Sequence, residues 1–186
     1  MSSRWKLIIE YDGLPFNGWQ SQKDNSGVQD FLKTAIKNFS NEAVKIYAAG
    51  RTDSGVHALG QVVHFDLERQ TSANEIREAL NNHLKPNPIA VISAEEVSND
   101  FHARFSALKR HYRYDIINRR PPLTLDKGRY WRVGKSLDIR SLKNMIANKL
   151  AKNPDIGIRS HLNKMEKQLS GYDDAVVVSF VKSKVG

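Results

Sequence analysis

Residues 50–65 read Gly50-Arg51-Thr52-Asp53-Ser54-Gly55-Val56-His57-Ala58-Leu59-Gly60-Gln61-Val62-Val63-His64-Phe65. The stretch sets one carboxylate, Asp53, between Arg51 and two glycines, Gly55 and Gly60, which let the backbone turn where a side chain would obstruct it. Alternating apolar residues at 44–48 precede it and an apolar run at 62–65 follows it, so it is predicted to connect two strands. Such a loop can hold a reactive carboxylate beside an anionic substrate, although a bare Arg-x-Asp is also the pattern of a local ion pair.

The first hundred residues alternate between strand and helix patterns. Strands are predicted at 5–11, on the two sides of the Asp53 loop, and at 89–97, with helices between them at about 26–39 and 72–84. This β-α-β-β-α-β order is typical of the ferredoxin-like arrangement, which RNA-binding sheets also use. Helices then cover one face of the sheet and the other face stays open.

Both predicted helices begin with a capping signal. Ser26 is expected to cap the first helix, with Gln29 completing a capping box, and Ser72 the second, with Glu75 in the same role. The prolines at 86 and 88 are expected to end the second helix.

The second half of the chain predicts a related but incomplete unit. Strands are expected at 110–117, near 130–133 and at 175–181, and amphipathic helices at about 138–150 and around Leu162, Met165 and Leu169. A full ferredoxin-like unit would need more chain than this. We therefore expect an α+β protein with an N-terminal ferredoxin-like domain at 1–100 and an incomplete second unit at 101–186.

The composition is that of a soluble globular protein, with 40% hydrophobic and 26% charged residues. The lack of cysteine excludes disulfides and thiolate metal sites and suits the reducing cytosol. No apolar segment suggests a signal peptide or a membrane span. We therefore expect a cytoplasmic protein without a membrane partner.

The net charge of +9 lies entirely in the second half. Residues 1–100 carry 10 Lys/Arg and 13 Asp/Glu, a net of −3, whereas residues 101–186 carry 19 and 7, a net of +12. The densest part, 104–120, sets six cations against the single acid Asp115 and interleaves them with aromatic rings. Cations beside flat rings suit phosphate contacts and base stacking, although basic surface is also common on solvated strands.

The string at 50–65 resembles the signature of the TruA-type tRNA pseudouridine synthases, with Ser54 where that family usually has alanine. Three further blocks agree with the family and follow its order. They are Tyr11-Asp12-Gly13 with Phe16 and Gly18-Trp19-Gln20-Ser21-Gln22; Val28-Gln29; and Phe101-His102-Ala103-Arg104-Phe105-Ser106-Ala107 with Arg110-His111-Tyr112-Arg113-Tyr114. The resemblance implies the pseudouridine synthase fold, two ferredoxin-like units with a catalytic cleft between them, and a C-terminal motif that we do not find.

The resemblance also implies the chemistry. Pseudouridine formation breaks the bond from uracil N1 to ribose C1′, turns the base and rejoins it through C5, so neither cofactor nor metal is required. Asp53 would be the catalytic carboxylate, by attack on C1′, addition to uracil C6 or proton abstraction from the sugar. Arg51 would keep Asp53 ionised and would also serve as a wedge or a phosphate contact once the target uridine is flipped out. Tyr112 would stack on the uracil.

The resemblance further implies that Arg104 and Arg110 hold the RNA backbone, and Lys109 and Arg113 lie in the same basic segment. It implies a homodimer acting on the anticodon stem-loop of tRNA. A shortened relative that binds RNA without catalysis is the alternative.

Asp53, His57 and His64 could also be interpreted as metal ligands, as in a metal-dependent hydrolase. This interpretation is not favoured, because a catalytic metal usually needs three well-oriented protein ligands. His57 is expected to shape the loop by hydrogen bonding, and Phe16 and Trp19 either to stack on RNA or to fill a core edge.

Overall fold

The computed structural model describes residues 2–138, 141 and 175–183. The chain divides into two compact units, Met1–Ala107 and Leu108–Gly186, and it is a mixed α+β protein. Within the described ranges, no helix is both long and apolar enough to cross a membrane.

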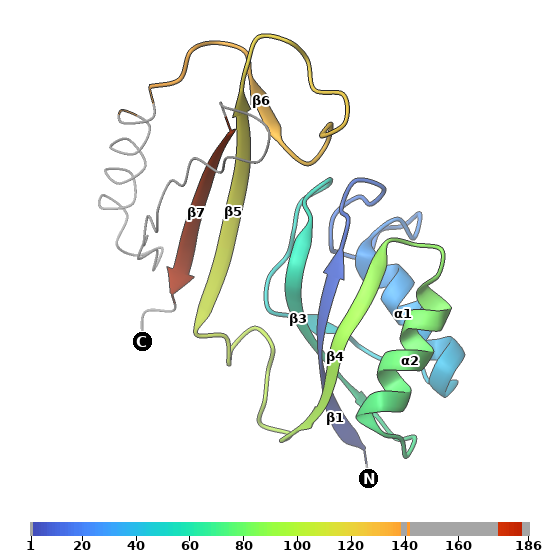
Figure 1. Cartoon of the computed structure of the whole chain (residues 1–186). Coiled ribbons are helices and arrows are strands. Elements are labelled where there is room, and N and C mark those ends of the chain that lie inside the picture. The colour runs from blue at the N-terminus through green and yellow to red at the C-terminus, as the bar shows by residue number, and fades with distance from the viewer. Residues whose placement is uncertain (1, 139–140, 142–174, 184–186) are drawn as a thin grey trace. The chain divides into compact units, whose positions relative to one another are not determined.

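The first unit is a four-stranded antiparallel sheet with two helices on one face (Figure 1). Its elements in chain order are β1 (Ser3–Tyr11), α1 (Val28–Ser40), β2 (Tyr47–Ala48), β3 (Ala58–Leu67), α2 (Ala73–Leu84) and β4 (Ile89–Val97). The strands lie in the order β2-β3-β1-β4, so β1 occupies the interior and pairs with both β3 and β4. The β-α-β-β-α-β element order predicted from the sequence is therefore observed.

The core of this unit lies between the sheet and the helices. Alternate residues of β1, such as Leu7 and Ile9, are fully buried, because successive side chains of a strand point to opposite faces. Leu7 is opposite Val63 of β3, which is also fully buried. The helices add Leu32 and other stripe residues to the same cluster.

The capping prediction is confirmed for α2 and wrong for α1. Ser72 caps α2 and accepts a hydrogen bond from the Glu75 backbone, as expected. For α1, however, the N-cap is Gly27 and its box is closed by Asp30. The Ser26 hydroxyl is instead engaged with Asp24 and Asn17, so it does not cap the helix.

The strand expected at 44–48 is also shorter than predicted, because only Tyr47–Ala48 pairs with β3. Further upstream, a side chain instead of the backbone accepts the hydrogen bonds from the segment that follows β3. The Glu42 carboxylate accepts hydrogen bonds from the backbone N–H groups of Glu68 and Arg69, both at 2.9 Å. Backbone pairing is therefore replaced by a carboxylate contact at this end of the sheet.

The described part of the second unit is a three-stranded sheet in the order β6-β5-β7. Its strands are β5 (Lys109–Asn118), β6 (Trp131–Val133) and β7 (Ala175–Ser183), and they confirm the three expected strands within a few residues. β5 runs parallel to β6 and antiparallel to β7. The expected helices at 138–150 and around Leu162 lie outside the described residues.

Candidate active site

The Asp53 loop packs against the loop that follows β1. The Trp19 N–H donates to the Thr52 carbonyl at 2.9 Å, so the residue just before Asp53 is fixed through its backbone. The buried Tyr11 hydroxyl lies 2.8 Å from Thr52 Oγ1, and burial raises the pKa of this phenol. On the other side of Asp53, the Ser54 hydroxyl donates to the Phe16 carbonyl at 3.3 Å. Both neighbours of Asp53 are thus attached to the first loop.

Two glycines allow this close approach. A Cβ added to Gly13 would lie 2.2 Å from the Val56 carbonyl oxygen, and one added to Gly18 would lie 2.7 Å from the Thr52 carbonyl oxygen. Gly18 also has a φ of +80°, which L-residues with side chains rarely adopt. The contact between the two loops is therefore backbone against backbone and leaves no room for a side chain.

Asp53 itself lies at the tip of a turn. The Val56 N–H donates to the Asp53 carbonyl at 3.2 Å, and Gly55 has a φ of +77°, which confirms its predicted role. Gly60 has no such role, because it lies inside β3 and an added Cβ would only touch the Ile8 side chain at 3.7 Å. The carboxylate is thus exposed to solvent on a turn that is closed by a backbone hydrogen bond.

The local ion pair suggested by Arg-x-Asp is not formed. Arg51 and Asp53 are both exposed and, within the part of the chain that the structure describes, no ion pair joins them. Both charged groups are therefore available to a ligand.

His57 ties the end of this loop to the turn after β1. Its Nδ1 accepts a hydrogen bond from the Gly13 N–H at 3.2 Å and lies 3.1 Å from an Asp12 carboxylate oxygen. The contact supports the expected loop-shaping role. Across residues 2–138, 141 and 175–183, no cluster of three or more His, Asp or Glu side chains is arranged to hold a metal ion.

A buried carboxylate that the sequence analysis missed organises the first loop. Asp30 accepts hydrogen bonds from the backbone N–H groups of Gln22 (3.0 Å) and Gly27 (3.1 Å) and contacts the Ser21 hydroxyl. It is only 7% exposed. Its position three residues after Gly27 is the spacing of a capping box, which is the sequence signal that could have identified Asp30.

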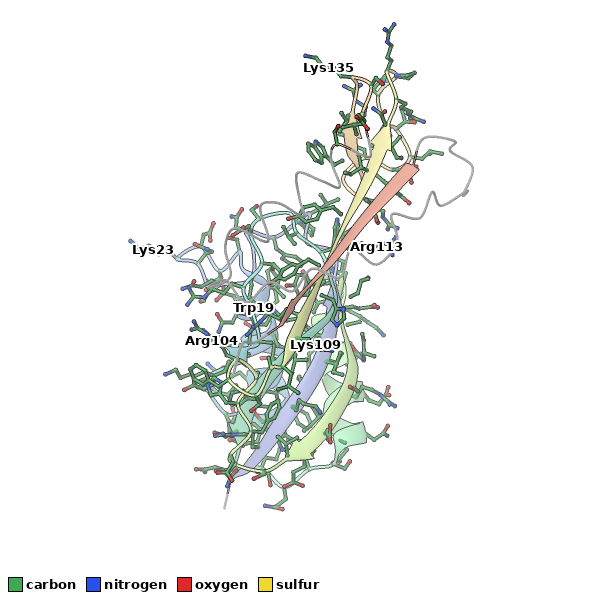
Figure 2. All side chains as sticks on the ribbon, turned by 90° about the vertical axis from the view of Figure 1, so that its left-hand side faces the viewer. Trp19, Lys23, Arg104, Lys109, Arg113 and Lys135 are labelled. Atoms are coloured by element: carbon green, nitrogen blue, oxygen red, sulfur yellow. The ribbon has the colours of Figure 1, made fainter. Side chains whose placement is uncertain are left out.

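Lys23 extends from this loop away from the rest of the first unit (Figure 2).

The positions of Phe16 and Trp19 decide between RNA stacking and core packing, which the sequence left open. Both are 3% exposed and belong to the hydrophobic core, where Phe16 packs edge-on against Phe31 with ring centroids 5.2 Å apart. They fill a core edge and are not free to stack on RNA.

The strap, which we define as residues 98–107, crosses the face of the sheet opposite the helices. It is held there by His64 of β3, which is 1% exposed and whose Nδ1 accepts a hydrogen bond from the Ala103 N–H at 3.1 Å. The His64 ring stacks on Tyr47 with centroids 4.9 Å apart and meets His102 of the strap at 4.7 Å. Arg4 adds a second attachment, because it pairs with Asp66 and donates to the Phe101 carbonyl at 2.9 Å.

This environment makes the stability of the protein depend on pH through His64. Burial, helped by His102 and Arg4, lowers the pKa of His64 from 6.5 to about 4. Between these values the unfolded chain binds a proton that the folded protein does not, so the free energy of unfolding falls as pH drops from about 6.5 to about 4.

The contribution of His64 is tested by comparing how the unfolding free energy of the parent and of His64→Phe depends on pH. His64→Phe cannot take up this proton, so its deficit in unfolding free energy relative to the parent should be largest above pH 6.5 and shrink towards pH 4. Urea melts of both proteins across that range measure it. A deficit that stays constant with pH would contradict the assignment.

The predicted RNA-binding residues fall on two elements. Arg104 is exposed on the strap in the first unit, whereas Lys109 and Arg113 are exposed on β5 in the second (Figure 2). Arg110 is half-buried, and Arg113 pairs with Asp115 at 2.7 Å, which is the acid in that basic segment. Asp115 therefore pairs with one cation of this basic segment.

Tyr112 also lies on β5, with its side chain 39% exposed. Strand alternation puts it on the same face as Arg110 and Tyr114 and on the opposite face from Lys109 and Arg113. Asp53 and Arg51 belong to the first unit, so the predicted site residues are divided between the two units.

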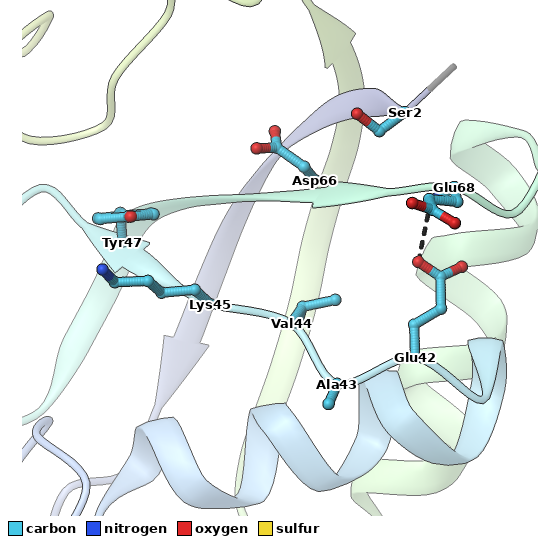
Figure 3. A pocket seen from close by; sticks show the side chains of 8 residues that line it. All are labelled: Ser2, Glu42, Ala43, Val44, Lys45, Tyr47, Asp66 and Glu68. Carbon is cyan, nitrogen blue, oxygen red and sulfur yellow. Dashed lines mark hydrogen bonds between the residues drawn. The ribbon is translucent and has the colours of Figure 1, made fainter.

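A pocket of about 460 Å³ lies beside the short β2 edge but is unsuited to RNA (Figure 3). Three carboxylates, Glu42, Asp66 and Glu68, line it, and anionic walls repel phosphate. Two of them are also committed, since Glu42 holds the backbone after β3 and Asp66 pairs with Arg4. The candidate site therefore remains the Asp53 loop.

The model of a protein family described as tRNA pseudouridine synthase matches residues 7–106, which is more than half of the chain and includes both packed loops and the strap up to residue 106. The chain belongs to this family. Among the tRNA pseudouridine synthases it resembles, the enzyme named tRNA pseudouridine synthase A of Parvibaculum lavamentivorans is 56% identical over 135 residues, or 73% of this chain and 55% of that protein.

Two further tRNA pseudouridine synthases show the same pattern. The protein of Maricaulis maris is 54% identical over 139 residues, covering 75% of this chain and 56% of the relative. The protein of Xanthobacter autotrophicus is 52% identical over 149 residues, covering 80% of this chain and 61% of the relative. The chain thus spans little more than half the length of these tRNA pseudouridine synthases.

Proposed function

We propose that this chain is an isomerase that converts uridine to pseudouridine in tRNA. The observation that carries the proposal is the Asp53 loop, which lies within the residues matched by the family model and presents an exposed carboxylate. Both neighbours of Asp53 are hydrogen-bonded to the first loop, Thr52 through its backbone carbonyl and Ser54 through its side-chain hydroxyl. A reaction that only exchanges a glycosidic bond from N1 to C5 needs a well-positioned carboxylate and a way to hold the loosened base. Rigid positioning of a reacting group is itself a major source of rate.

In this proposal Asp53 is the catalytic residue. The bond between uracil N1 and ribose C1′ breaks, the base turns, the bond between C5 and C1′ forms, and the hydrogen of C5 leaves as a proton. Asp53 acts by attack on C1′, by addition to C6 or by proton abstraction from the sugar. Its exposure, without a pairing partner in Arg51, supports a carboxylate kept ready for substrate.

Two further residues have proposed roles in the same step. Arg51, which is exposed two residues before Asp53, would contact the flipped uridine or an adjoining phosphate. Tyr112 would stack on the uracil and place its hydroxyl near the C5 proton. The role of Tyr112 rests on the family resemblance and on its partly exposed ring.

The proposed partner is tRNA, contacted at the anticodon stem-loop through Arg104, Lys109, Arg110 and Arg113, with a homodimer as the working form. The basic second half of the chain supports an RNA partner, since neutralising phosphates dominates affinity for nucleic acid. We further propose that the first unit is ferredoxin-like, which its strand order β2-β3-β1-β4 with both helices on one face supports. A cytoplasmic location, with no cofactor, completes the proposal.

A second function remains in competition, namely a relative that binds RNA without isomerising it. The basic second half of the chain suits RNA binding with or without catalysis. Chemical mapping of pseudouridine in a tRNA transcript incubated with the protein separates the two functions. Pseudouridine at a defined position supports the isomerase; salt-sensitive tRNA binding without any pseudouridine supports the alternative.

A substitution at Tyr112 tests its proposed role. Tyr112→Phe keeps the ring and removes the hydroxyl, so tRNA affinity should stay unchanged while the isomerisation rate falls about 100-fold, the low end of the range for one acid–base group. Single-turnover isomerisation and filter binding measure the two quantities. Tyr114→Phe on the same face of β5 is the matched control and should keep the parent rate. Equal rates for Tyr112→Phe and the parent would contradict a role for the hydroxyl.

A further inference from the structure

We propose that His64 is a positioning residue, whose buried imidazole fixes the strap and thereby sets Arg104 in place for RNA. The inference rests on the RNA contact proposed above for Arg104 and extends it to a residue that does not touch RNA.

The contact between His64 and the strap is a specific hydrogen bond as well as a hydrophobic one. Ala103 is 2% exposed and His64 is 1% exposed, so the hydrogen bond from the Ala103 N–H to Nδ1 is sheltered from water. Without an acceptor at this place the buried N–H would be unsatisfied, which is unfavourable. Nδ1 must be unprotonated to accept, and burial favours that neutral form of the ring.

A second histidine carries this constraint to Arg104. The His102 ring packs against His64 with centroids 4.7 Å apart. Its Nδ1 accepts hydrogen bonds from the N–H groups of Arg104 (3.2 Å) and Phe105 (3.4 Å). Two hydrogen bonds between His102 and Ser106 close the turn. The backbone of Arg104 is therefore attached, through His102, to a ring that the sheet holds.

The upstream end of the strap is held independently. The Nη1 group of Arg4 donates to the Phe101 and Asn99 carbonyls, while its Nε and Nη2 groups donate to the Asp66 carboxylate. Loss of the His64 contact alone should therefore release the Ala103–Ser106 turn without detaching the whole strap. That separation makes the inference testable in a folded protein.

The test measures how tRNA affinity depends on salt for the full chain and its variants. Arg104→Ala removes one phosphate contact, so it should weaken binding and reduce the slope of log K against log salt by about one. His64→Phe keeps a ring on Tyr47 but has no acceptor, and it should reduce the slope by a similar amount. His64→Asn restores an acceptor near the position of Nδ1 and should bind like the parent. The double variant His64→Phe/Arg104→Ala should have the same slope as Arg104→Ala.

Each outcome decides one point. If Arg104→Ala binds tRNA as the parent does, the proposed RNA contact is wrong and the inference is overturned with it. If Arg104→Ala lowers the slope but His64→Phe does not, the inference alone is overturned and the proposed function stands. Should His64→Phe fail to fold, His64→Gln replaces it, because its carboxamide reaches beyond the Nδ1 position. An unchanged slope in His64→Gln, with fast hydrogen exchange showing that the hydrogen bond of the Ala103 amide is lost, also overturns the inference.

Discussion

Asp53→Ala is expected to abolish pseudouridine formation while leaving tRNA affinity almost unchanged. The substitution removes the proposed catalytic carboxylate but none of the proposed cationic phosphate contacts. Both neighbours of Asp53 are held by groups that the substitution leaves in place, the Thr52 carbonyl and the Ser54 hydroxyl, so the loop should keep its conformation. We expect the isomerisation rate to fall by about 10³-fold or more, as is typical when an essential reacting group is removed.

Two controls accompany this variant. Asp53→Asn keeps the size of the side chain and should be as inactive as Asp53→Ala, because the reaction needs the charge. Glu78→Gln removes an exposed carboxylate from α2 and should isomerise at the parent rate. An isomerisation rate for Asp53→Asn close to that of the parent, or a large loss of tRNA affinity in Asp53→Ala, would contradict the role assigned to this residue.

Gly13→Ala should have the second largest effect on activity, because it separates the loop after β1 from the Asp53 loop. The added methyl group would lie 2.2 Å from the Val56 carbonyl oxygen, and both partners belong to backbone. Neither side can rotate away, so the two loops must separate and the contacts around Thr52 and Ser54 must loosen. We expect a loss of about 3 kcal/mol or more in unfolding free energy, in the range of severe packing changes, and an isomerisation rate at least 100-fold lower.

Gly60→Ala is the matched control for this steric argument. Its added methyl group would meet only the Ile8 side chain at 3.7 Å, an ordinary contact distance, so unfolding free energy should change by no more than about 0.5 kcal/mol. Thermal melts and single-turnover rates of the two variants make the comparison. Equal melting temperatures for Gly13→Ala and Gly60→Ala would show that the loops tolerate separation.

Strong periodic patterns made much of the first unit predictable from sequence. The alternation at 5–11 and the run at 89–97 correspond to β1 and β4, and Ser72 with Glu75 caps α2 as expected. These signals are local, because each depends on residues only two to four positions apart. The site loop was equally readable, since its glycines and its polar residues stand next to one another in the sequence.

The errors arose where a side-chain contact competes with the expected role of a residue, once from nearby in the sequence and once from far away. Ser26 satisfies the local rule for an N-cap, but its hydroxyl is engaged by Asp24 and Asn17, so Gly27 takes the position. The segment before Tyr47 alternates as a strand does, yet the Glu42 carboxylate occupies the N–H groups that follow β3. The Glu42 contact has no signature in the local pattern, whereas Gly27 and Asp30 have the spacing of a capping box.

The role of His64 also could not be predicted from local sequence patterns. In the sequence it is one histidine in an apolar run, and the remote reading of it was as a metal ligand. Its actual contacts come from Tyr47 and from the strap about forty residues further along. Only the folded sheet brings these groups together, so the positioning role could not have been inferred from spacing alone.

The most direct test of the central claim is release of tritium from unmodified tRNA labelled at uridine C5, measured with the purified 186-residue chain. Joining C5 to the ribose must expel that hydrogen, whichever route Asp53 takes. Our account predicts release by the parent chain and none by Asp53→Asn. Absence of release from the parent, in a folded protein that still binds tRNA, would contradict the proposal that this chain is an isomerase.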